Sequence, residues 1–130
     1  MPLPSYAYEG DAAFDLYSRE DMTVAPGARV AVPTGIALAI PEGYVGLVWD
    51  KSGLAIKQGL KTLGGVIDSG YRGEIMVGIF NTGAETYVFK KGEKVAQMII
   101  QEKEVVHIEE VDELDNDTHR GDKGFGSSGK

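Results

Sequence analysis

The chain of 130 residues has no cysteine, a single tryptophan and two histidines. Without cysteine it forms no disulfide, no thiolate metal site and no thiol nucleophile. No apolar run reaches the roughly 18–20 residues that a membrane helix needs, and the first residues lack the apolar core of a signal peptide. We therefore expect a cytoplasmic protein with no membrane partner, of a length that fits one domain.

Positive charge is also scarce along the chain. Thirteen Lys and Arg stand against twenty Asp and Glu, which gives a formal net charge of −7. A protein held on nucleic acid by a broad basic surface needs the opposite balance, so we expect no nucleic-acid partner. The imbalance is greatest in residues 102–122, which contain nine acidic residues and two basic residues. We expect this region to be solvated.

Glycine, by contrast, is abundant: its 18 residues are about twice the usual share of roughly 7%. Apolar residues recur with a period of two, which is typical of strands. The expected strands are residues 29–32, 36–40, 44–49, 74–81, 86–89, 95–101 and 105–108. One short helix is expected at residues 53–58, ended by Gly59. This pattern predicts an all-β fold, a distorted β-barrel or jelly-roll-like subunit.

The C-terminal tail differs from the rest of the chain. Residues 121–130 contain four glycines, two serines and a single large apolar side chain, Phe125. Such a segment cannot bury enough apolar surface to fold by itself. We expect residues 1–119 to form the all-β domain and residues 120–130 to form a flexible, glycine-rich tail.

Two segments in the middle of the chain could carry chemistry. KSGLA at residues 51–55 places a cation, a hydroxyl and free helix amides together, which suits an anion; a serine cap beside a solvated lysine is the structural alternative. GGVIDSGYRG at residues 64–73 places the carboxylate of Asp68 among glycines that allow a close approach to the backbone. Its alternative is a plain hairpin with an exposed aspartate.

Two further segments lie towards the C-terminus. Gln97 stands in an otherwise apolar strand, where its amide needs a partner, and that partner could be structural or a ligand. Residues 120–128 combine an arginine, an aromatic ring, hydroxyls and glycines, which can hold phosphate and stack on a base. A disordered polar tail explains the same composition. Together the four segments indicate a nucleotide site.

Five segments, taken in chain order, resemble the five motifs of the trimeric dUTP diphosphatases. AAFDL at residues 12–16 is similar to A-G-[YF]-D-L, and KSGLA at residues 51–55 to R-S-G-L-A. GVIDSGYRG at residues 65–73 is similar to G-V-I-D-x-D-Y-R-G, and KGEKVAQM at residues 91–98 to G-x-R-[IV]-A-Q. RGDKGFGSSG at residues 120–129 is similar to R-G-x-G-G-F-G-S-T-G. The motifs span nearly the whole chain.

The resemblance implies a homotrimer of jelly-roll-like subunits with three sites shared between subunits. It implies hydrolysis of dUTP to dUMP and pyrophosphate with Mg²⁺, which limits uracil in DNA and supplies dUMP. Asp68 would activate the attacking water, Asp15 would reach the metal through water, and the tail would close as a lid. The substrate-binding residues implied are Lys51, Ser52, Gly53, Thr62, Gly65, Val66, Ile67, Tyr71, Met76, Gln97, Arg120, Phe125, Gly126, Ser127 and Ser128.

The chain departs from the family pattern at several positions. Lys51 replaces an arginine, which is not a conservative change at a bidentate phosphate contact. Gly70 stands where many members carry aspartate, and Thr62 where some bacterial members carry an asparagine that contacts uracil. Two other activities remain open at this point. One is a dCTP deaminase of the same fold, and the other is a nucleotide-binding regulator with weak catalysis.

Overall fold

The computed structural model describes residues 3–126, which form nine strands and one short helix. In chain order the elements are β1 (Phe14–Tyr17), β2 (Met22–Val24), β3 (Arg29–Ala37), β4 (Tyr44–Trp49), α1 (Ser52–Gln58), β5 (Leu60–Leu63), β6 (Val66–Ile67), β7 (Glu74–Asn81), β8 (Tyr87–Phe89) and β9 (Lys94–Glu102). The expected all-β class with one short helix is confirmed.

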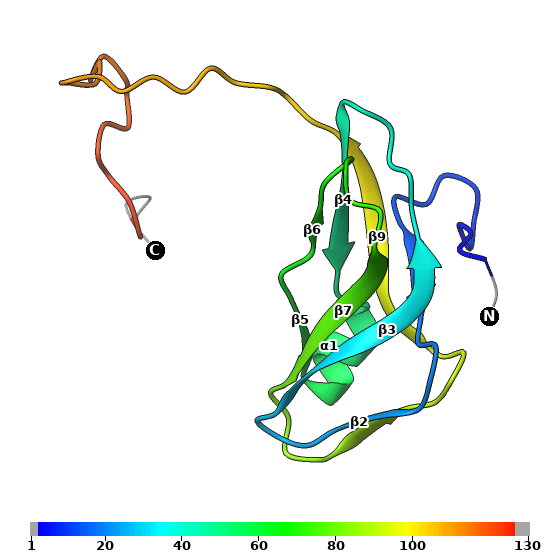
Figure 1. The fold of residues 1–130 in the computed structure, drawn as a ribbon. Helices are drawn as coiled ribbons and strands as arrows, with labels where there is room; N and C mark the ends of the chain where they lie inside the picture. Colours follow the sequence, from blue (N-terminus) through cyan, green and yellow to red (C-terminus); the bar gives the residue numbers. More distant parts are fainter. Residues whose placement is uncertain (1–2, 127–130) are drawn as a thin grey trace.

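The strands form three antiparallel sheets (Figure 1). A four-stranded sheet has the order β1-β9-β4-β6, a three-stranded sheet has the order β3-β7-β5, and β2 pairs with β8. The sheets of the described residues do not join into one closed barrel. Because β5 and β6 belong to different sheets, the short segment between them crosses from one sheet to the other.

The core lies between the sheets, and the period-two pattern explains which side chains enter it. Along β7 the side chains of Ile75, Val77 and Ile79 are fully buried, whereas Met76 between them is exposed. Leu16 of β1 and Met98 of β9 close the core from the four-stranded sheet. Met76 is thus left on the outer face, beside the loop that follows β6.

The helix α1 ends as the sequence predicts, because Gly59 adopts a φ of 73° and its amide closes the last turn. Its start differs: Lys51 occupies the N-cap position, and no side chain caps the helix. The interpretation of Ser52 as a capping residue is therefore wrong. Among the described residues, no helix is long and apolar enough to span a membrane.

Three of the expected strands differ in the structure. Residues 29–32 and 36–40 were expected as separate strands, but β3 runs through Pro33 to Ala37, with an irregular register against β7. Residues 105–108 form no strand, and Val105, Val106 and Ile108 are exposed. The chain leaves the body after β9 (Figure 1), so within residues 3–126 this segment meets no strand to pair with.

Asn81, at the end of β7, is fully buried, and its side chain makes three hydrogen bonds. Its Nδ2 donates to the carbonyls of Val24 (3.0 Å) and Glu85 (2.8 Å), and its Oδ1 accepts from the amide of Gly83 (2.9 Å). The side chain thereby links β2, β7 and the turn before β8.

We predict that Asn81→Ala lowers the free energy of unfolding by about 2–3 kcal/mol, because buried backbone groups lose their partners. Chemical denaturation at fixed protein concentration measures this. The control Asn116→Ala, at an exposed position, is expected to change the value by less than about 0.5 kcal/mol. Equal effects of the two changes would contradict a structural role for the buried amide.

Candidate functional site

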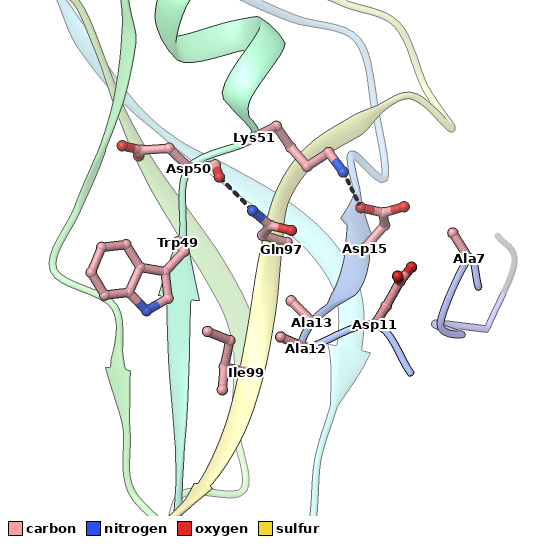
Figure 2. Close-up of a pocket in the computed structure, with 10 residues that line it drawn as sticks. All are labelled: Ala7, Asp11, Ala12, Ala13, Asp15, Trp49, Asp50, Lys51, Gln97 and Ile99. Atoms are coloured by element: carbon pink, nitrogen blue, oxygen red, sulfur yellow. Dashed lines mark hydrogen bonds and ion pairs between the residues drawn. The ribbon is translucent and has the colours of Figure 1, made fainter. Parts of the chain in front are cut away.

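The junction between β4 and α1 carries a charged cluster, which lines a cavity of about 440 Å³ (Figure 2). Lys51 Nζ lies 2.6 Å from Asp15 Oδ1, and Lys94 Nζ lies 3.3 Å from Asp15 Oδ2. Asp15 projects from β1 and is nearly buried, with 6% of its surface exposed. One aspartate is thus held between two lysines that come from the helix start and from β9.

Opposing effects act on the ionisation of Asp15. Burial disfavours the charged carboxylate, but the two ammonium groups of Lys51 and Lys94 outweigh this and hold the pKa below its ordinary value. The carboxylate is therefore fully ionised at neutral pH. It presents oxygen atoms that suit a hard cation such as Mg²⁺, or water molecules bound to such a cation.

Gln97 of β9 lies between Asp50 and Asp15 in the same cavity (Figure 2). Its Nε2 donates to the backbone carbonyl of Asp50 at 2.7 Å. The structural hydrogen bond that the sequence left open is therefore present. This bond uses one amide hydrogen, and no side chain or backbone group of residues 3–126 accepts the second hydrogen on Nε2.

Asp50 and Trp49 also line this cavity, and neither was among the site residues predicted from the sequence. Asp50 Oδ1 accepts from the hydroxyl of Thr62 (2.6 Å) and from its amide (2.8 Å). Lys61 Nζ lies 2.9 Å from Asp50 Oδ2. An acidic residue directly before the KSG segment was the only signal, and no sequence spacing connects it with Thr62.

The predicted catalytic carboxylate lies in a second region, on the loop between β6 and β7. Asp68 is exposed and lines a cavity of about 210 Å³ together with Val66, Ile67, Tyr71, Glu74 and Met76. The amide of Tyr71 donates to the carbonyl of Asp68 at 3.1 Å, and the Tyr71 hydroxyl donates to the carbonyl of Glu74 at 2.8 Å. These bonds fix the turn that carries Asp68.

Gly65 sits where the chain passes close to β4. Its φ is +107°, and a Cβ there would lie 3.0 Å from the carbonyl oxygen of Val48. The carbonyl of Gly65 in turn accepts from the Val48 amide at 2.8 Å. Gly65, Val66, Thr62 and Trp49 line a third cavity of about 240 Å³. Only glycine fits this position without moving the β4 backbone.

The structure therefore distributes the predicted residues over separate places. It brings Asp15, Lys51 and Gln97 together, and it brings Asp68, Tyr71 and Met76 together in a different cavity. Ser52 and Gly53 are exposed at the start of α1.

The tail residues lie away from both groups in the single chain (Figure 1). Arg120 donates from Nε to the carbonyl of Lys123 at 2.6 Å, and Phe125 is fully exposed. Gly126 adopts a φ of 80°. Ser127 and Ser128 lie outside the described residues. The described tail thus offers a cation and a free aromatic ring that its own chain leaves unburied.

Comparison with known proteins decides the family. The family model for dUTPase matches residues 1–129. The chain belongs to the dUTPase family. It is 50% identical to the deoxyuridine 5'-triphosphate nucleotidohydrolase of Corynebacterium glutamicum, over 100% of this chain and 89% of that protein. It is 48% identical to the protein of the same name in Mycolicibacterium vanbaalenii, over 99% of this chain and 88% of that protein.

Solved dUTPase structures share the fold. The dUTPase of Staphylococcus bacteriophage 80alpha with dUpNHpp superposes with a TM-score of 0.92 at 30% identity, covering 99% of this chain and 92% of the other. A mutant dUTPase from phage phi11 of S. aureus, described with a structural Mg(II) ion, gives a TM-score of 0.80 at 28% identity, covering 87% of this chain and 91% of the other. These findings do not favour the dCTP deaminase alternative.

We predict that the ion pairs of Asp15 stabilise the fold at neutral pH and cease to do so in acid. Because the folded pKa lies below the ordinary value of 3.8, the unfolded chain takes up a proton first as the pH falls. Asp15→Asn should therefore lower the free energy of unfolding by about 1–3 kcal/mol at pH 7. This difference should shrink once the pH falls below 3.8.

Urea denaturation of both proteins at pH 7 and pH 3, at one protein concentration, tests this. The surface change Glu20→Gln serves as the control and should cost less than about 0.5 kcal/mol at pH 7. A deficit of Asp15→Asn that is as large at pH 3 as at pH 7 would exclude the ionised carboxylate as its source.

Proposed function

We propose that this chain hydrolyses dUTP to dUMP and pyrophosphate, with Asp68 activating the water that attacks the α-phosphorus. The observation that carries the proposal is a carboxylate held on a glycine-flanked turn beside Tyr71, in a member of the dUTPase family. The reaction would limit uracil in DNA and supply dUMP. The relatives compared above carry the name deoxyuridine 5'-triphosphate nucleotidohydrolase.

Asp68 acts as the base. A carboxylate oxygen accepts a hydrogen bond from water and can take its proton as the water attacks. A positioned base contributes about 10²–10⁴-fold to the rate, and alignment of water and phosphorus supplies much of the remainder. The bond that forms joins the water oxygen to the α-phosphorus, and the bond that breaks releases pyrophosphate.

The cluster at the start of α1 binds the triphosphate. Lys51 supplies a compact positive charge, and the exposed amides at Ser52 and Gly53 supply donors. Gln97 has an amide hydrogen left for a phosphate oxygen. Lysine replaces the family's arginine here, so this contact is a point charge and not a bidentate fork.

The residues present fit a Mg²⁺ ion that the phosphates hold. Asp15 places an ionised carboxylate in the cavity, and the described residues contain no group of three or more His, Cys, Asp or Glu placed to bind a metal by themselves. Mg²⁺ keeps several waters and suits such a site, so Asp15 would reach it through water. When bound, the ion neutralises phosphate charge.

The loop between β6 and β7 selects the nucleoside. The backbone from Gly65 to Ile67 can present amide and carbonyl groups to the uracil edge, and cytosine would leave such groups unpaired. Tyr71, whose hydroxyl is tied to Glu74, would pack under the deoxyribose. Thr62 lines the cavity of about 240 Å³ beside Gly65, and Met76 lines the cavity of about 210 Å³ beside Asp68. A methyl group is worth only ~1–3 kcal/mol, so excluding thymine needs a tight loop.

The active assembly we propose is a homotrimer with shared sites. Asp68 and Lys51 line different cavities of one chain, so a partner's surface has to complete each half. Residues 103–126 leave the body (Figure 1). The large apolar side chains of this segment are exposed. The tail, residues 120–130, would close as a lid, with Phe125 on the base and Arg120, Gly126, Ser127 and Ser128 near the phosphates.

We predict that the protein releases pyrophosphate from dUTP in the presence of Mg²⁺ and far less from dCTP, dTTP, dATP or dGTP. Asp68→Asn should lower kcat by about 10²-fold or more while dUpNHpp still binds, because only the base is lost. A coupled pyrophosphate assay and calorimetry measure the two effects. The control Glu42→Gln should behave as wild type.

Two results would contradict the proposal. Ammonia release from dCTP without pyrophosphate would indicate the deaminase. Wild-type turnover by Asp68→Asn would remove Asp68 from the mechanism.

We also predict that two defective chains restore each other. In a 1:1 mixture of Lys51→Ala and Asp68→Asn chains, about a quarter of shared sites receive both intact residues. Co-expression with two different tags and double purification yields the mixed trimers. Their activity should exceed the mean of the two parental proteins, whereas sites contained within one chain would give that mean and no more.

A further inference from the structure

We propose that Asp50 is a positioning residue of this enzyme, which holds the phosphate-binding turn and the strand leading to the Asp68 loop in a fixed relation. The proposal rests on the dUTP hydrolysis inferred above. Asp50 acts through Lys51, Gln97 and Thr62 and is not itself a catalytic residue.

Asp50 makes contacts in two directions from one backbone position. Its carboxylate accepts from the Thr62 amide (2.8 Å) and hydroxyl (2.6 Å) and pairs with Lys61 (2.9 Å). Its backbone carbonyl accepts from Gln97 Nε2 (2.7 Å). Burial of the carboxylate disfavours its charge, but the Thr62 donors and Lys61 outweigh this and keep its pKa below the ordinary value.

These contacts join the two larger sheets at the site. Gln97 lies on β9, which pairs with β4 in the four-stranded sheet, whereas Thr62 lies on β5 of the three-stranded sheet. Asp50 follows the last residue of β4, where Trp49 pairs with Gln97. Among the described strands no backbone ladder connects β4 to β5, so the side chain of Asp50 provides a hydrogen-bonded link at this point.

Both functional segments start at this link. Lys51 is the next residue, at the N-cap of a helix that has no side-chain cap, so its backbone position depends on Asp50. Thr62 stands two residues before Gly64, where the chain crosses to β6 and then reaches Asp68. Holding Thr62 therefore fixes the entry to the loop that carries the base.

A small displacement of either segment would misalign the water, the phosphorus or the cations in the shared site to which that segment contributes. A misplacement of about 1 Å can lower a rate by about 10²-fold. The ammonium of Lys51 sits on a long flexible stem and still reaches a phosphate after such a shift. Loss of the link should therefore reduce kcat more than it reduces affinity.

The test uses Asp50→Ala, Thr62→Val and Thr62→Ser in the full chain. We expect Asp50→Ala to lower kcat by about 10–100-fold while the dissociation constant of dUpNHpp with Mg²⁺ changes by less than about threefold. Thr62→Val should lower kcat in the same way, and Thr62→Ser, which keeps the hydroxyl, should restore it. Asp50→Ala/Thr62→Val should be no slower than Asp50→Ala, because both changes break one link.

The matched control is Asp21→Asn. The Asp21 carboxylate also accepts from a backbone amide, that of Lys91 at 2.8 Å, but Asp21 is exposed and lines none of the three cavities of the site. Its kcat should equal that of wild type. Where Asp50→Ala fails to fold, the Thr62 pair and the isosteric Asp50→Asn carry the same test.

Three results would overturn the proposal. The first is a kcat of the folded variants equal to wild type with only a lower Tm, which indicates a purely structural bond. The second is an equal loss of kcat and of dUpNHpp affinity in Asp50→Ala. The third is a double variant in which the loss of kcat, expressed as a free energy, equals the sum of the losses of the two single variants. Failure of the wild-type protein to hydrolyse dUTP would instead refute the proposed function.

Discussion

The pairing of β4 on both of its edges is the constraint on which the rest of the site depends. β9 binds one edge of β4 and β6 binds the other, with Val48 bonded to the carbonyl of Gly65 at 2.8 Å. This close approach excludes a Cβ at Gly65 and sets where the loop of Asp68 begins. The same strand delivers Asp50 and Lys51 just beyond its end. One strand thus positions both the Asp50–Lys51 turn and the start of the Asp68 loop.

The sequence was sufficient for the parts of the fold that local patterns determine. Alternating apolar residues located β4, β7 and β9, and Gly59 located the end of α1, because burial and backbone freedom act on neighbouring residues. The order of the five motifs identified the family. Short strands such as β6 (Val66–Ile67) were not predicted, because two residues carry no period.

Contacts between residues that are far apart in the sequence could not be predicted from the sequence. The link from Asp50 to Thr62 joins residues twelve apart, one just after β4 and the other on β5 of another sheet. The bond from Gln97 to Asp50 joins residues 47 apart. Residues 105–108 have a strand pattern but no neighbouring strand in the part of the chain that the structure describes. Their conformation is decided by what lies beside them, which a single sequence does not state.

The charges around the cavity of about 440 Å³ are balanced before any substrate binds. The aspartates that line it are Asp11, Asp15 and Asp50, and the lysines are Lys51 in its wall with Lys61 and Lys94 in ion pairs. The negative charges of the three aspartates and the positive charges of the three lysines cancel, whereas a triphosphate brings several further negative charges. Burying it there requires further positive charge. A divalent cation and an arginine delivered from the C-terminal tail would supply that charge only when the substrate is bound.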